Sequence, residues 1–536
     1  MKRHLHRFCA ILLMIAIMPF SSCDALPDGV GAAKAIPIQH RGRIKSLEAF
    51  SREVVKQITG REKFDGRPAI LVILDAAANP SKVGEWKWIR IDDAEMKAYL
   101  GLPILESTFS DADLAPSLPT IHTLVRQAQT KRDSDLPLTQ YEQRAETIFS
   151  QIHTVRQIQE GSIFALIPAP AGGHWGTLAG PPSPLHTTFA ELLSLHRAGD
   201  DAGFRAKTAG WIGIVRSQSP EAADAATSLE IIYYRLPPFQ ISWIAYLASF
   251  VLLTFFGTRP RLRLAGLAVL VAGILFHSWG LLLRVLILDR PPVSNMYESM
   301  VFMNWILMLI AILFAAAKRN LIVLKVGALV SALVMIYSDL LPIDADMNVL
   351  VPVLRSNYWL TIHVLTIVAS YGVLALAMGL GHRFLILDAL GRFHDRKAEE
   401  ASATAVIRTI QLGALLLGIG TVLGGIWANE SWGRFWGWDP KETWALITFL
   451  GYLVIIHLRA TGRLGNFGLA VGSIVNFLLV LMTWYGVNFV LGQGLHSYGF
   501  GAGGLPWVLL YVALECLFTA FVVVRKLLWR KAHGQS

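Results

Sequence analysis

The pattern of hydrophobic positions divides the chain into two parts of different kinds. Short amphipathic stretches alternate with polar segments up to about residue 238, and long apolar blocks follow from residue 239. A membrane-spanning helix needs about 20 mostly apolar residues. Nine blocks approach or exceed this length, namely 241–256, 264–288, 300–317, 321–341, 359–381, 404–426, 443–458, 466–491 and 506–524. We therefore predict a polytopic all-α membrane protein with about nine transmembrane helices in residues 239–536.

Residues 26–238 are expected to form a mixed, mainly helical extracytoplasmic domain. The stretch "SLEAFSREVVKQITG" places apolar side chains on one helical face, with Ser46 as the N-cap and Gly60 as the stop signal. The stretch "LTQYEQRAETIFSQIHTVRQI" predicts a second amphipathic helix, and "AILVIL" at 69–74 is interpreted as a buried strand. The histidines of this domain are scattered without the spacing of metal ligands, so we assign it no catalytic site.

The first 25 residues resemble a secretory signal. A basic start, a short apolar run and small residues near Ala25 are typical of a signal peptide, and an uncleaved N-terminal anchor is the alternative. Either places residue 26 onward outside the cytoplasm. The sequence does not decide whether Cys23, in "FSSC", is lipidated.

The charges between the apolar blocks predict the topology. If the first block starts outside, every predicted inner connection is rich in lysine and arginine, including Arg259, Arg383 and the tail with Lys526 and Lys531. This is the positive-inside bias, and nine crossings leave the C-terminus in the cytoplasm. The net charge of +10 is explained by these positions, so nucleic acid is not expected as a partner.

A segment between the sixth and seventh blocks, "WANESWGRFWGWDPKETW", is predicted to face outward. It contains five tryptophans together with Asp439 and two cations, at positions Trp427, Trp432, Arg434, Trp436, Trp438, Lys441 and Trp444. Indole rings beside cations suit a flat, anionic, aromatic ligand such as a porphyrin with two propionates. An interfacial aromatic belt is the alternative, and the residues of this segment alone do not separate the two.

Histidines at the same predicted face favour the porphyrin reading. His363 lies near the outer end of the fifth block and His496 in the last outer loop, where two imidazoles suit the axial positions of haem iron. His457 lies at the cytoplasmic end of the seventh block. His277 lies near mid-membrane, where a polar ring needs a partner or a function. Arg284 either snorkels to the interface or pairs with a propionate.

The three cysteines exclude some classes of function. Cys9, Cys23 and Cys516 form neither a CxxC nor a CxxCH motif. The chain is therefore not an obvious thiol oxidoreductase, and it is not itself a c-type cytochrome.

Three motifs resemble a known family. "WGRFWGWDPKETW" is similar to the tryptophan-rich WWD motif of haem-handling proteins, and "PPVSNMYESM" and "GLHSYGF" resemble the CcsA/ResC-type proteins of System II cytochrome c biogenesis. The resemblance covers about residues 264–524. It implies that His363 and His496 ligate haem at the outer face, beside the motif, and that His457 belongs to a transmembrane haem site.

The resemblance also implies partners and an activity. The expected ligand is haem b, and the expected partners are a CcsB/ResB-type membrane protein, apocytochrome c with its CxxCH motif, and membrane lipid. The second ligand of the inner site comes from the CcsB/ResB partner in that family, and this chain shows no evident CcsB-like portion. The implied location is the bacterial cytoplasmic membrane.

The implied chemistry is thioether formation by a haem–cytochrome c ligase, although the sequence leaves the enzymatic role uncertain. A haem exporter or chaperone that passes haem on without ligating it would need the same ligands. Two further alternatives are a System I relative that shares the tryptophan motif and a non-haem membrane transporter.

Overall fold

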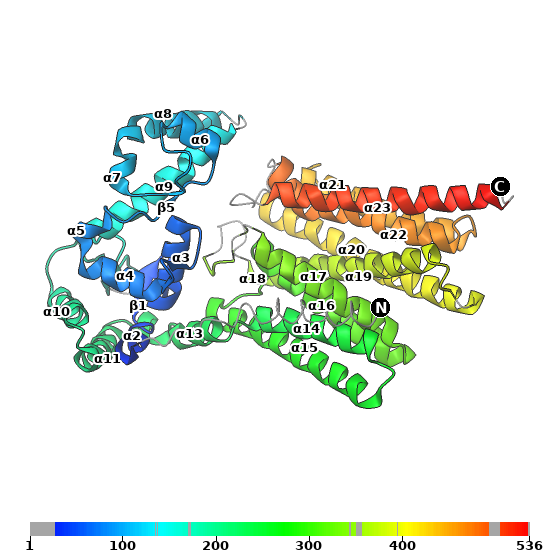
Figure 1. Cartoon of the computed structure of the whole chain (residues 1–536), viewed down its shortest axis with the longest axis horizontal. Coiled ribbons are helices and arrows are strands. Elements are labelled where there is room, and N and C mark those ends of the chain that lie inside the picture. Colours follow the sequence, from blue (N-terminus) through cyan, green and yellow to red (C-terminus); the bar gives the residue numbers. More distant parts are fainter. Residues whose placement is uncertain are drawn as a thin grey trace. The chain divides into compact units, whose positions relative to one another are not determined.

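The computed structural model describes residues 27–134, 136, 138–169, 173–341, 343, 345–349, 356–393, 395–491 and 504–533. These residues form two compact units, one ending at Leu236 and the other beginning at Pro237. The predicted signal segment, 1–25, and His496 lie outside the described residues. Figure 1 shows the course of the chain through both units.

The N-terminal unit is mainly helical, and its described residues include four small antiparallel strand pairs. Its strands are β1 (Pro37–His40), β2 (Arg43–Ser46), β3 (Lys63–Phe64), β4 (Arg67–Pro68), β5 (Ile89–Arg90), β6 (Thr108–Phe109), β7 (Ala165–Ile167) and β8 (Gly176–Thr177), paired β1–β2, β3–β4, β5–β6 and β7–β8. Its helices are α2 (Asp28–Ala33), α3 (Leu47–Thr59), α4 (Ala69–Ala78), α5 (Pro80–Val83), α6 (Ala94–Tyr99), α7 (Asp111–Leu114), the 3₁₀ turn η2 (Ala115–Ser117), α8 (Leu118–Asp133), α9 (Gln140–Glu160), α10 (Pro184–Ala198), α11 (Asp201–Gln218), α12 (Pro220–Asp224) and α13 (Thr227–Arg235). The mixed, mainly helical prediction is confirmed.

Both amphipathic helices predicted in this unit are present, and α3 begins and ends at the predicted Ser46 and Gly60. In α3 the Ser46 side chain accepts a hydrogen bond from the Ala49 N–H, and Gly60 ends the helix in the left-handed region at φ 70°. Helix α9 starts with a capping box between Thr139 and Glu142 and ends at Gly161, which is also left-handed. Local capping signals therefore specify both helices.

The prediction of a strand at 69–74 is wrong, because these residues begin helix α4. Ile70, Val72, Ile73 and Leu74 are all almost completely buried and Leu71 is partly buried, so most of the run faces the core. Periodicity cannot separate a buried strand from a buried helix in so short an apolar run. The next residues, "DAAA", are compatible with a helix and extend it to Ala78.

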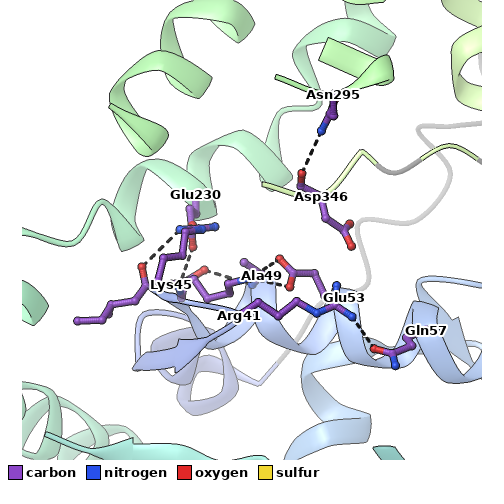
Figure 2. Close-up of polar contacts among 11 residues, drawn as sticks. Arg41, Lys45, Ala49, Glu53, Gln57, Glu230, Asn295 and Asp346 are labelled. Atoms are coloured by element: carbon purple, nitrogen blue, oxygen red, sulfur yellow. Dashed lines mark hydrogen bonds and ion pairs between the residues drawn. The ribbon is translucent and has the colours of Figure 1, made fainter. Parts of the chain in front are cut away.

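A buried ion pair fixes the start of α3 within the N-terminal unit. Lys45 and Glu53 are both buried, and the Lys45 ammonium donates to both carboxylate oxygens of Glu53 at 2.8 and 2.6 Å (Figure 2). Glu230 on α13 accepts from the Ser46 N–H at 2.7 Å and pairs with Arg43 at 2.5 Å. Because a buried charge is stable only when it is paired, these contacts tie α13 to the hairpin formed by β1 and β2.

The second unit is a bundle of long apolar helices. They are α14 (Pro238–Phe255), α15 (Pro260–Leu288), α16 (Met296–Lys318), α17 (Leu321–Leu340), α18 (Asn357–Trp359), the π-helical turn η4 (Leu360–Val364), α19 (Leu365–Ala389), α20 (Arg396–Trp432), α21 (Pro440–Ala460), α22 (Asn466–Leu481), the π-helical segment η5 (Met482–Leu491) and α23 (Leu505–Ala532). Within the described residues, nine helical segments are long and apolar enough to cross a membrane, which confirms the predicted architecture.

Helix α19 lies at the centre of this bundle, packed against α16, α17, α20 and α22. Its residues from Ser370 to Gly381 are all buried. Small residues permit the close approach of helices in such bundles. A Cβ at Gly372 would lie 2.3 Å from the Met303 carbonyl oxygen, and one at Gly381 would lie 2.1 Å from the Ser473 hydroxyl.

Two features of the bundle differ from the simple helix blocks in the sequence. Helix α20 continues to Trp432, so Trp427 and Trp432 stand on a helix and the connecting loop is only Gly433–Asp439. The chain is also π-helical at 360–364 and 482–491. Single π-helical turns within α-helices are frequent at functional sites.

Candidate functional site

A cavity of about 180 Å³ lies where α20 ends and α21 begins, which we call the tryptophan end of the bundle. Its walls come from η4, α19, α20, α21, η5 and the segment that leads into α16. The lining residues include His363, Trp427, Trp436, Lys441 and Glu442. The fold thus brings together a histidine, two indoles and a cation that are separated by up to 78 positions in the sequence, from 363 to 441.

His363 stands on the π-helical turn η4. Its Nδ1 lies 2.9 Å from the carbonyl oxygen of Gly420, and its ring centroid is 5.7 Å from that of Trp427. A Cβ at Gly424 would lie 2.7 Å from His363 Cε1, so the glycine makes room for the imidazole. In the tautomer in which Nδ1 donates to Gly420, the lone pair lies on Nε2. A carbonyl-held Nδ1 is the usual arrangement of a metal-ligating histidine.

The loop after α20 is shaped by backbone conformation and by capping. Gly433 ends α20 in the left-handed region, and Trp438 also has a positive φ of 59°. Asp439 caps α21 through a capping box with Glu442, and the Glu442 carboxylate also accepts from the Gly437 N–H at 2.8 Å. These bonds hold Trp436 in the cavity wall, whereas Trp438 is 70% exposed.

Lys441 is the cation of the cavity wall. Its ammonium donates to the Trp484 carbonyl oxygen at 3.3 Å and to the Asn488 side-chain oxygen at 3.4 Å. These long bonds to neutral acceptors leave its charge without a carboxylate in ion-pair contact among the described residues. An anionic group entering the cavity would therefore find a positive charge already in place.

The remaining residues of the tryptophan segment support this wall without lining the cavity. Arg434 lies 3.5 Å from the Glu442 carboxylate and 5.9 Å from the ring centroid of Trp432. The Trp444 carbonyl oxygen accepts from Thr448 and Thr483, which ties α21 to η5. The structure thus separates residues that line the cavity from residues that shape it, a division the sequence did not reveal.

The segment that leads into α16 forms another wall, through Ser294, Asn295 and Met296. Glu298, which follows it, is fully buried and accepts from the Ser294 N–H and hydroxyl at 2.9 and 2.6 Å. Arg284 pairs with Glu298 at 3.0 Å and also donates to the Ala345 carbonyl oxygen. The role of Arg284, open in the sequence, is that of a buried partner of Glu298.

The sequence analysis missed several lining residues, among them Ser299, Tyr371, Thr483, Trp484 and Asn488. Trp484 donates its indole N–H to the Ser299 hydroxyl at 3.0 Å, which connects η5 to α16. These residues lie in apolar blocks whose composition explains them as membrane-buried. The only sequence signal was the polar Asn488 near the end of a helix.

Two of the predicted histidines lie away from the cavity. His277 is fully buried, with Nδ1 3.0 Å from the Tyr246 hydroxyl and Nε2 3.1 Å from the Val301 carbonyl oxygen. Both ring nitrogens are thus engaged, so the structure favours a packing role for this residue. His457 stands near the end of α21, at the opposite end of the bundle, with Nδ1 2.7 Å from the Leu453 carbonyl oxygen.

Comparisons with known proteins point to one family. A family model described as "Cytochrome C assembly protein" matches residues 293–496, which include the cavity-lining segments. Protein NrfI of Wolinella succinogenes is 32% identical over 490 residues, 86% of this chain and 53% of that protein. The chain therefore spans about half the length of NrfI.

Two further relatives match less than half of this chain. Cytochrome c biogenesis protein CcsA of Mesostigma viride is 35% identical over 263 residues, which are 42% of this chain and 85% of that protein. CcsA of Chlamydomonas reinhardtii is 35% identical over 264 residues, 46% of this chain and 74% of that protein.

Proposed function

Because the chain belongs to the CcsA family of cytochrome c biogenesis proteins, we propose that it binds haem b as a substrate in the cavity at the tryptophan end and presents it for attachment to apocytochrome c. The observation that carries this proposal is the position of His363, whose Nδ1 is held by Gly420 beside Trp427 and above an aromatic cavity. Carbonyl-anchored imidazole and flanking indoles suit an iron porphyrin.

Each described residue has a distinct part in this proposal. His363 supplies one axial nitrogen to the iron, and Trp427 and Trp436 contact the porphyrin plane. Lys441 meets a propionate, because its ammonium has only neutral acceptors within reach among the described residues. His496, outside the described residues, is proposed as the second axial ligand on the grounds of the family resemblance.

The cavity is small relative to a porphyrin, so haem binding requires its walls to separate or part of the ring to stay outside. The 180 Å³ space is bounded by the Gly433–Asp439 loop and by η5, whose continuation lies beyond the described residues.

The chemistry in this proposal is the addition of two thiols to two vinyl groups. The CxxCH cysteines of apocytochrome c add S–H across each C=C bond of reduced haem, which forms two thioethers with no leaving group. The chain itself positions the haem, and no acid–base pair of its own is assigned to the step.

The proposed setting is the bacterial cytoplasmic membrane. The positive-inside pattern supports an outward tryptophan end. His457 would then lie at the cytoplasmic end, where it would share an inner haem site with a CcsB/ResB-type partner. The N-terminal unit would then be extracytoplasmic.

The test is a spectrum of the full-length protein in detergent, purified alone and with a CcsB/ResB-type partner. We expect a reduced bis-histidine haem spectrum that is lost in His363→Gly and returns when imidazole is added, since free imidazole replaces the missing ligand. His457→Ala should lose haem only from the preparation with the partner. An absence of haem in every preparation would contradict the proposal and leave the tryptophans as an interfacial belt.

A second assay separates ligation from simple delivery. Purified protein and partner, reduced haem and an apocytochrome c peptide with CxxCH are combined, and thioether formation is followed by mass spectrometry. Covalent product that depends on His363 supports a ligase. Haem transfer without covalent product supports the exporter or chaperone alternative.

A further inference from the structure

A second and larger cavity lies inside the helical bundle. Its volume is about 900 Å³, and its walls come from α14, α16, α17, α19, α22, η5 and α23. It follows α17 from Ile322 to Leu341, a distance of about 28 Å at 1.5 Å per residue. Most of the lining is aliphatic or methionine, so the cavity offers an elongated apolar space that crosses much of the bundle.

The cations of this space lie toward the end of the bundle opposite the tryptophan end. Lys325 and Arg383 line the apolar cavity there. A neighbouring cavity of about 510 Å³ shares Ile322, Arg383 and Leu387 with it and is also lined by Asn320, Arg392 and Ser402. A basic compartment thus adjoins a long apolar one, and Arg383 belongs to both.

The cations of the basic compartment are held by neutral groups in the part of the chain that the structure describes. Among the described residues, no carboxylate lies in ion-pair contact with Lys325, Arg383 or Arg392. Arg383 donates to the Ser402 hydroxyl at 3.1 Å, a neutral acceptor. Lys325 and Arg383 are only partly exposed, and both line the apolar cavity. Cations held together in apolar surroundings are costly unless an anion joins them.

We propose that these two cavities form a binding site for one anionic phospholipid. The phosphate binds Arg383, Lys325 and Arg392 in the basic compartment, and the acyl chains extend along α17 into the apolar cavity. Lysine and arginine pockets between transmembrane helices are the general form of such sites, and the predicted topology puts this one in the cytoplasmic leaflet.

Haem is another anionic amphiphile, but the geometry favours the lipid. The histidine that lines the apolar cavity is His382, whose Nδ1 lies 3.0 Å from the Met378 carbonyl oxygen and whose Nε2 lies 2.8 Å from the Glu515 carboxylate. Both nitrogens are engaged, so iron would have to displace one partner. The elongated shape also fits extended acyl chains better than a compact planar ring.

The experiment measures the lipid that stays with the full-length protein. Protein is purified in a mild detergent, and bound phosphatidylglycerol, cardiolipin and phosphatidylethanolamine are quantified per protein by mass spectrometry. In Arg383→Gln with Lys325→Gln we expect anionic lipid to fall at least about tenfold, because each cation near a lipid headgroup is worth about 1 kcal/mol. The matched control is Lys318→Gln, an exposed lysine at the same end of the bundle.

A second variant tests the apolar compartment without touching the charges. Leu329→Trp fills the cavity that the acyl chains would occupy and keeps all three cations. It should also lose anionic lipid, while its elution as a single species in size-exclusion chromatography shows that it folds. Added phosphatidylglycerol should raise the thermal midpoint of the unaltered protein and of Lys318→Gln. It should not raise the midpoint of the two cavity variants, which are Leu329→Trp and the double variant Arg383→Gln with Lys325→Gln.

Two results would overturn the proposal. One is anionic lipid that remains at the unaltered level in both cavity variants. The other is a haem spectrum that is lost in Arg383→Gln and persists in His363→Gly, since this would make the inner compartment a porphyrin site.

Discussion

His277 and His363 are two imidazoles in apolar parts of the same bundle, and their surroundings differ in a way that separates packing from a candidate site. The region around His277 is closed, and Tyr246 and Val301 take up both ring nitrogens. His363 has its Nδ1 2.9 Å from the Gly420 carbonyl oxygen, and its side chain lines a cavity. A buried histidine therefore indicates function only where there is also space for a ligand.

The largest expected effect is a contrast between substitutions of these two residues: one should lower haem content and the other should lower stability. His363→Ala should lower bound haem at least about tenfold, the scale of loss of a metal site whose ligand sphere is broken, with little change in thermal midpoint. His277→Ala should keep haem in the protein that folds, but lower stability by about 2–4 kcal/mol, because it leaves a cavity and two unpaired polar groups.

The measurements are haem per protein, from the pyridine haemochrome spectrum, and thermal midpoint, from the loss of monodisperse protein on heating. Loss of haem in His277→Ala at an unchanged midpoint would reverse the comparison. It would assign the haem to the region around α15.

The second prediction compares two ion pairs. Arg284 and Glu298 are almost fully buried, whereas Arg396 and Glu400 form an exposed pair at 2.9 Å on α20. Glu298→Gln should reduce stability by about 3–5 kcal/mol, because it leaves Arg284 buried without its counter-ion. Glu400→Gln should change it by less than about 1 kcal/mol.

Glu298→Gln should also lower haem content, because Glu298 holds the Ser294 segment of the cavity wall. The measurements are the thermal midpoint and the amount of haem per protein of the two variants, taken under the same conditions. Equal effects of the two substitutions would contradict a structural role for the buried pair.

Particular residues show how far the sequence determines these features. The nine helical segments, the ends of α3 and the presence of α9 were predictable, because hydrophobic length, capping and helical periodicity are local properties. The run at 69–74 was not, since a continuous apolar run lacks the periodicity that distinguishes strand from helix. These residues form helix α4 because of how they pack in the core of the N-terminal unit, which the local sequence does not reveal.

The candidate site divides in the same way. The sequence indicated His363 and the tryptophan segment, because an unusual composition in a predicted outer loop is visible without a fold. It did not indicate Trp484, Asn488 or the Arg284–Glu298 pair, because their roles arise from contacts between elements far apart in the chain. His496 stays a prediction.

The third prediction concerns His40, in the N-terminal unit. Burial, with the nearby charges of Lys45, Arg41 and Arg43, lowers the pKa of His40 to about 3. The unfolded chain binds a proton near pH 6.5 and the folded unit does not, so stability is full above pH 6.5 and falls as pH drops toward 3. The contribution of His40 to the free energy of unfolding changes by at most about 1.4 kcal/mol per pH unit.

Hydrogen exchange of β1 and β2 in the full-length protein, corrected for intrinsic exchange rates, measures this slope. His40→Gln should flatten the slope between pH 6 and pH 4, a range set by the lowered pKa. An unchanged slope in that variant would show that other groups carry the acid sensitivity.

The smallest expected effect concerns the start of α21, which forms one wall of the cavity. Asp439 accepts from the Lys441 N–H at 2.8 Å and shares a capping box with Glu442. Asp439→Ala should cost about 1 kcal/mol, and Asp439→Asn much less, because asparagine is also a good N-cap. Hydrogen exchange should increase in the first turn of α21 in the alanine variant alone. If the cap positions Lys441 and Trp436, haem affinity should fall in the alanine variant and stay near the unaltered value in the asparagine variant. Equal affinity in the two variants would show that packing against η5, and not the cap, holds the cavity wall.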